Sequence, residues 1–124
     1  MEERIIRQLK ECGVDYEGTM DRFLNNEGML CKFLKKFPED GSYAQILETV
    51  EKKDYAVAFR AAHTLKGVAA NLGLESVRKH ASEITELLRD KAQDEVNEQR
   101  LAEELVLLQE KYTEVCAVIN NIDS

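Results

Sequence analysis

Residues 54–73 read DYAVAFRAAHTLKGVAANLG, and this stretch decides the fold. Asp54 is a residue type that caps helix N-termini, and Gly73 is the type most often found just after a helix C-terminus. Between them, apolar residues recur at steps of three and four, which is the period of an amphipathic helix. This stripe consists of Ala58, Ala62, Leu65, Ala69 and Leu72. The stretch is therefore predicted to form one helix that buries the stripe.

Stripes of the same period follow this helix. A helix over about residues 75–91 is predicted from Val77, Ala81, Ile84 and Leu88. A longer helix over about residues 94–120 carries a seam of alternating fours and threes, made of Leu101, Leu105, Leu108, Tyr112, Val115, Ile119 and Ile122. The seam could form a coiled-coil dimer or pack within the chain. Because comparable stripes occur elsewhere in the chain, we expect intramolecular packing and a monomer.

The first part of the chain contains shorter helical segments. They are marked by three apolar groups: Ile5, Ile6 and Leu9; Met20, Phe23 and Leu24; and Met29, Leu30, Phe33, Leu34 and Phe37. Pro38 and Gly41 should interrupt the last segment. The spacing of Ser42 and Gln45 then predicts a capping box that starts a new helix. That helix carries Ile46, Leu47 and Val50. No segment alternates as a strand does, so the sequence predicts an all-α fold.

The length and charge of the chain limit what it can be. With 124 residues, of which 44% are hydrophobic, residues 1–124 have the size and the core of a single domain. There is no room for a nucleotide-binding lobe beside a bundle, so self-phosphorylation with ATP is not expected. The formal net charge of −7 repels the phosphate backbone of nucleic acid. DNA or RNA binding is therefore not expected.

Location and cysteine usage also follow from the sequence. No apolar run approaches the roughly 20 residues that span a bilayer, and the start Met-Glu-Glu-Arg lacks the order of a secretory signal. We expect a cytoplasmic protein without membrane contact. Cys12, Cys31 and Cys116 are far apart and form no Cys-x-x-Cys pair for zinc or redox chemistry. We expect them to be reduced and partly buried.

His63 is predicted to face solvent on the helix of residues 54–73. At about 100° per residue it lies roughly 140° from the centre of the buried stripe. A lone histidine is most often a plain structural residue, but the outward neighbours of His63 are small: Ala56, Gly67 and Ala70. A glycine in mid-helix costs about 1 kcal/mol relative to alanine, and a close approach by another molecule would explain it.

The charge around His63 also differs from that of the rest of the chain. No Asp or Glu occurs over residues 55–74, whereas Arg60 and Lys66 lie about one turn from His63. A neutral imidazole has a nucleophilic nitrogen near physiological pH. A nearby ammonium can neutralise phosphate oxygens in a transition state. These features favour phosphoryl transfer.

The run HTLKG at residues 63–67, followed by AANLG at residues 69–73, resembles the signature of histidine-containing phosphotransfer (Hpt) domains of multistep two-component phosphorelays. The resemblance extends over about residues 13–119. It implies an antiparallel up-down four-helix bundle with additional short N-terminal helices. It also implies a phosphoryl carrier without autokinase activity, which accepts a phosphoryl group on His63 from a receiver-domain aspartate and passes it to another receiver domain.

The resemblance assigns roles to individual residues. His63 would be phosphorylated, Lys66 would be its electrostatic helper, and Gly67 would leave clearance for the partner. Candidates for partner docking are Arg60, Ala70, Thr85 and Arg89. Family members often use a Gln or Glu on the following helix to hydrogen-bond the ring, and Thr85 occupies the matching position here.

The implied partners are response-regulator receiver domains and a hybrid sensor kinase. Magnesium is expected on the receiver domain, and no cofactor or metal is expected on this chain. The main alternative is a helical interaction module that binds a signalling partner through the same face without being phosphorylated. A metal-binding bundle is disfavoured because His80 is far from His63 in sequence and is expected to be a surface residue. A histidine-kinase dimerisation domain is also disfavoured. Such domains normally have an acidic residue immediately after the histidine, and this chain has Thr64 there.

Overall fold

The computed structural model describes residues 1–122. Its helices are α1 (Glu3–Glu11), α2 (Tyr16–Arg22), α3 (Glu27–Lys36), the 3-10 helix η1 (Phe37–Glu39), α4 (Ser42–Glu51), α5 (Tyr55–Asn71), α6 (Glu75–Leu88), the 3-10 helix η2 (Gln93–Glu95) and α7 (Glu98–Ile119). The described residues contain no strand, and Val14 and Leu74 pair in an isolated antiparallel bridge. The predicted all-α class is confirmed.

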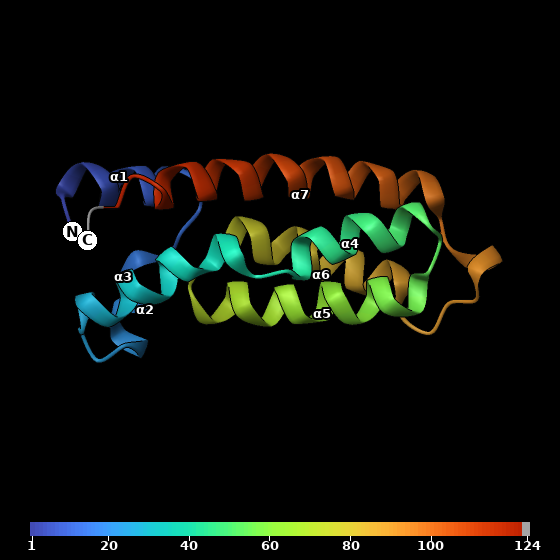
Figure 1. Cartoon of the computed structure of the whole chain (residues 1–124), viewed down its shortest axis with the longest axis horizontal. Coiled ribbons are helices and arrows are strands. Elements are labelled where there is room, and N and C mark those ends of the chain that lie inside the picture. The colour runs from blue at the N-terminus through green and yellow to red at the C-terminus, as the bar shows by residue number, and fades with distance from the viewer. Residues whose placement is uncertain (123–124) are drawn as a thin grey trace.

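The four helices α4 to α7 form the bundle, and each runs antiparallel to the one before it (Figure 1). α5 packs between α4 and α6, and α6 in turn packs against α7. Tyr43 of α4 stacks on Tyr112 of α7 with ring centroids 3.8 Å apart, which joins the first and last helices of the bundle. Leu65, Ile84 and Leu108 are fully buried at its centre. The predicted up-down four-helix bundle is confirmed.

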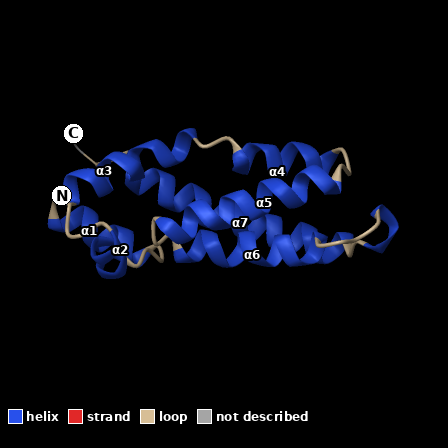
Figure 2. Ribbon diagram, turned by 90° about the horizontal axis from the view of Figure 1, so that it is seen from below, coloured by secondary structure: helices blue, strands red, loops and turns tan. Residues whose placement is uncertain are grey.

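The apolar seam of α7 packs inside the chain. Its buried members are Leu101, Leu108, Val115, Ile119 and Ile122. The helix starts at Glu98 rather than near residue 94, because the Asn97 side chain accepts a hydrogen bond from the backbone N–H of Arg100 at 3.1 Å and caps it there. The connection from α6 to α7 projects beyond the end of the bundle (Figure 2). Since α6 and α1 both pack against α7, the seam's buried residues are already in use within the chain.

The N-terminal helices cover the other end of the bundle. The short helix predicted at the start of the chain is α1, which packs against α7 and buries Ile5 and Leu9 (Figure 1). Leu24 was predicted to lie on a short helix, but α2 ends at Arg22. Leu24 turns the chain with a φ of 54° and is 88% exposed. Met29 and Phe33 are also exposed, at 47% and 43%. On α3 only the face of Leu30 and Leu34 packs on the core.

The start of α4 differs from the predicted capping box. Ser42 is the first helical residue and not the N-cap. Its backbone N–H donates to the Asp40 carboxylate at 2.9 Å, and its hydroxyl donates to the same oxygen. The prediction was wrong because Asp40 lies two residues upstream and accepts from Ser42 itself. The interruption by Pro38 is confirmed, since this residue lies in η1.

His80 was predicted to be a surface residue, but it is buried. It is 8% exposed, and its Nδ1 lies 2.9 Å from Oε2 of Glu104, itself 4% exposed on α7. Arg100 Nη1 lies 3.2 Å from the other carboxylate oxygen of Glu104. The apolar stripe of α6 did not reveal this position because α6 packs against two helices, α5 and α7, and buries a wider face.

Candidate functional site

The ends of α5 are fixed by their own residues. The Asp54 carboxylate accepts from the backbone N–H of Val57 at 3.4 Å, and so caps the first turn as predicted. Gly73 has a φ of +70°, and the N–H of Leu74 then reaches the carbonyl of Ala69 at 2.8 Å. This is the hydrogen bond of a Schellman motif, in which glycine allows the left-handed turn. These hydrogen bonds determine where α5 begins and ends.

Burial of the predicted stripe turns the opposite face of α5 outward. The stripe residues are all buried: Ala58, Ala62, Leu65, Ala69 and Leu72. His63 is exposed, as is Ala56. The predicted outward orientation of His63 is confirmed.

The ring of His63 rests beside an aromatic neighbour. The Phe59 ring lies one turn earlier on α5, with centroids 6.3 Å apart and planes 11° apart. Within residues 1–122 the imidazole makes no hydrogen bond or ion pair with another side chain. The adjacent Thr64 hydroxyl is occupied, because it donates to the carbonyl of Arg60 at 2.9 Å. Both ring nitrogens of His63 are thus open to an incoming group.

Gly67 faces open space one turn after His63. A Cβ built at this position meets no atom within 4 Å, apart from its chain neighbours and the helix's own backbone. Packing against another helix of the bundle therefore does not explain the glycine. Lys66 lies beside it and is partly exposed. Gly67 therefore leaves open space beside His63 on the outer face of α5.

Gly67→Ala is predicted to stabilise the domain by about 0.4 to 1 kcal/mol, because alanine restricts the unfolded chain and propagates a helix better than glycine. Gly67→Gln should retain part of that gain. Phosphoryl transfer should fall in both variants and fall further with the longer side chain, which fills the space beside His63. Thermal melts and transfer assays check both effects. Lower melting temperatures for both variants would contradict the exposed placement of this face.

A second group of charges reaches the site from α6. Arg89, just after the helix end, donates from Nε to Glu86 Oε2 at 3.1 Å and from Nη2 to Glu86 Oε1 at 3.0 Å. The Arg89 guanidinium also lies 5.2 Å from the centroid of the Phe59 ring. The hydrogen bond from Arg89 holds the pKa of the Glu86 carboxyl below its usual range, and the positive charges of Arg89 and Lys66 lower that pKa further. An acidic residue therefore lies close to both cations.

Glu86 was not predicted as part of this site. Residues 55–74 contain no Asp or Glu, whereas Glu86 approaches from the neighbouring helix. The spacing of three residues between Glu86 and Arg89 was the one available signal, because such pairs lie on the same face of a helix. The net positive charge around His63 is consequently smaller than the sequence indicated, because Glu86 offsets part of it.

The docking candidates do not all lie on the surface. Arg60 and Arg89 are exposed, and Ala70 is partly exposed. Thr85 is fully buried, and its hydroxyl donates to the carbonyl of Ala81 at 2.7 Å. The expectation that Thr85 contacts a partner or the ring was wrong, because α6 buries this residue in the bundle.

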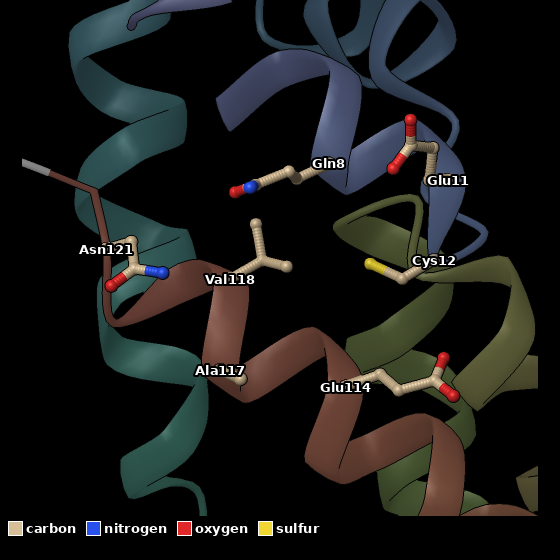
Figure 3. A pocket seen from close by; sticks show the side chains of 7 residues that line it. All are labelled: Gln8, Glu11, Cys12, Glu114, Ala117, Val118 and Asn121. Atoms are coloured by element: carbon tan, nitrogen blue, oxygen red, sulfur yellow. The ribbon is translucent and has the colours of Figure 1, made fainter. Parts of the chain in front are cut away.

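A groove of about 390 Å³ lies elsewhere, between α1 and the end of α7 (Figure 3). Gln8 and Cys12 line it from α1, and Glu114 and Val118 line it from α7. Burial, followed by the charge of Glu114, raises the pKa of the Cys12 thiol, so this thiol is protonated and poorly nucleophilic at neutral pH. All three cysteines are free and partly buried, as predicted.

Comparison with protein families places the site in a known context. The family model for the Hpt domain matches residues 28–118, which include the HTLKG run and all four helices of the bundle up to the last turn of α7. Comparison with curated proteins and with solved structures gave no match. Among the described residues, no helix is long and apolar enough to cross a membrane. Because the matched region covers well over half of the 124 residues, the chain belongs to the Hpt domain family.

Proposed function

We propose that this chain accepts a phosphoryl group on His63 from the aspartyl phosphate of one receiver domain and passes it to the aspartate of another. Membership of the Hpt family supports a role in histidine phosphotransfer in general. The observation that carries the assignment to His63 is its exposed ring, which makes no side-chain hydrogen bond or ion pair within residues 1–122 and lies beside the open face of Gly67. The other histidine, His80, is buried against Glu104 and is excluded as an acceptor.

The transfer step requires only a neutral imidazole and the donor. A ring nitrogen of His63 attacks phosphorus, a nitrogen–phosphorus bond forms, and the phosphorus–oxygen bond to the receiver's aspartate breaks. The aspartate leaves as a carboxylate, while the other ring nitrogen keeps its proton. Negative charge is spread over the phosphoryl oxygens in the transition state. Lys66, three residues after His63 on α5, is the cation that we propose stabilises that charge.

The family implies receiver domains of response regulators as partners. A hybrid sensor kinase is the proposed source of the phosphoryl group, which would reach His63 through the kinase's receiver domain. Magnesium is proposed to act on the receiver domain. We also propose that the chain acts as a cytoplasmic monomer, supported by the use of the α7 seam within the bundle.

The test is incubation of the chain with each receiver domain of the source organism, phosphorylated beforehand with acetyl phosphate. We expect at least one receiver to lose its label while the chain gains an acid-labile, alkali-stable phosphate, as phosphohistidine requires. The label should then move to a second receiver. Binding of a receiver without any gain of phosphate would instead identify a non-phosphorylated interaction module that uses the same face.

Lys66→Ala is predicted to slow phosphoryl transfer on the order of tenfold without abolishing it. The change removes a charge-assisted contact to the phosphoryl oxygens and leaves the nucleophile in place. The matched control is Lys79→Ala, since Lys79 is an exposed lysine on α6. Rapid-quench measurements of label transfer check the rates. A Lys66→Ala rate equal to that of wild type would show that Lys66 is an ordinary solvated lysine.

A further inference from the structure

Glu86 of α6 forms an ion pair with Arg89, near the helix face that carries His63. Two hydrogen bonds of 3.0 and 3.1 Å tie its carboxylate to the Arg89 guanidinium. Both side chains are about half exposed, at 57% for Glu86 and 44% for Arg89. The pair is therefore free to rearrange when a new charge arrives, since exposed ion pairs contribute little to stability.

Arg89 connects this pair to the ring that would carry the phosphoryl group. Its guanidinium packs on Phe59, 5.2 Å from the ring centroid, and Phe59 lies parallel to His63 with centroids 6.3 Å apart. On the other side, the charge of Lys66 is close enough to contribute to the lowered pKa of Glu86. Glu86 is thus paired with Arg89, and Arg89 is linked to His63 through the Phe59 ring.

We propose that Glu86 is a positioning residue that holds Arg89 in the unphosphorylated protein and destabilises phosphorylated His63, so that the phosphoryl group is readily passed on. This inference rests on the proposed function of His63. Glu86 would change the free energy of the phosphorylated chain and would take no part in the attack of His63 on phosphorus.

The electrostatic reason follows from the change in charge. Phosphorylation replaces a neutral imidazole with a group that carries a phosphoryl dianion, and Glu86 then lies near a second anion. Arg89 can hydrogen-bond either the carboxylate or the phosphoryl oxygens, so the two compete for it. At exposed sites such interactions are screened over about 8 Å at physiological ionic strength. Neutralising Glu86 should therefore have a modest effect that depends on salt.

The experiment measures how the phosphoryl group partitions at equilibrium between a receiver domain and this chain, with both proteins dilute enough to be unbound. Under that condition docking contacts cancel, and only the stability of the phosphorylated carrier changes the ratio. We expect Glu86→Gln to shift the ratio toward this chain by about threefold to tenfold at low salt. The shift should shrink as ionic strength rises.

Two variants act as controls. Glu83→Gln removes an exposed carboxylate on the same helix that faces Arg100 of α7 at 3.5 Å, and it should leave the ratio unchanged. Arg89→Gln should shift the ratio the opposite way, because Glu86 then repels the phosphoryl group without a neutralising partner. A ratio for Glu86→Gln equal to that of wild type, or equal to that of Glu83→Gln, would overturn the inference.

The salt series and the wild-type protein separate the remaining outcomes. A Glu86→Gln shift that persists undiminished at high salt would also overturn the inference, since it would not be electrostatic. Wild-type protein that takes up no phosphoryl group would overturn the proposed function, and this inference with it. Labelled wild type with no response to Glu86→Gln would overturn this inference alone.

Discussion

His63→Gln is expected to abolish phosphoryl acceptance while the bundle stays folded. The glutamine amide is not nucleophilic and cannot form the nitrogen–phosphorus bond. The histidine side chain is exposed and its one neighbouring ring is Phe59, so its loss should change the free energy of unfolding by no more than about 0.5 kcal/mol. Thermal melts and label transfer from a phosphorylated receiver domain check the two parts.

His80→Gln is the matched control, because it removes the other histidine of the chain. His80 is buried, and its loss disturbs the contact with Glu104 at 2.9 Å, so the free energy of unfolding should fall by about 1 to 3 kcal/mol. Acceptance should persist at temperatures where the variant is folded. Labelling of His63→Gln at the wild-type level would refute the assignment of the nucleophile.

Gly73→Ala is expected to destabilise the domain by about 2 to 5 kcal/mol. Its φ of +70° costs a residue with a Cβ about 1 to 2 kcal/mol. The added Cβ would also lie 1.9 Å from Thr19 Oγ1 and 2.8 Å from the backbone oxygen of Asp15. Relieving that overlap adds about 1 to 3 kcal/mol, because α2 must move away from the α5–α6 turn.

Gly67→Ala provides the comparison for Gly73→Ala on the same helix. The first substitution enters open space and should raise the melting temperature, whereas the second should lower it by roughly 8 °C or more for a domain of this size. Chemical denaturation of both variants gives the two free energies of unfolding. Similar melting temperatures for the two variants would contradict the different surroundings of these glycines.

The helix of residues 54–73 could be predicted almost completely from the sequence. Its caps at Asp54 and Gly73, its buried stripe and the outward direction of His63 all depend on local pattern. Local pattern suffices here because both caps are made by residues of the segment itself and the stripe is purely apolar.

Features that depend on neighbouring helices could not be predicted in this way. His80 and Thr85 are polar, and an analysis of apolar periodicity leaves such residues outside, yet α6 buries them because it packs against both α5 and α7. Glu86 joins the candidate site only through the packing of α6 beside α5. The capping box predicted at Ser42 does not form, because the carboxylate of Asp40 accepts the hydrogen bond from the Ser42 backbone N–H.

The central claim is that His63 carries the phosphoryl group, and ring-nitrogen NMR of the phosphorylated, ¹⁵N-labelled chain tests it most directly. The chain has two histidines, so the spectrum is simple to assign with His63→Gln. Phosphorylation should shift the ring nitrogens of His63, with phosphorus coupling to one of them, while those of buried His80 remain unchanged. Phosphorus coupling to His80, or a phosphate carried on a carboxylate with both rings unchanged, would contradict it.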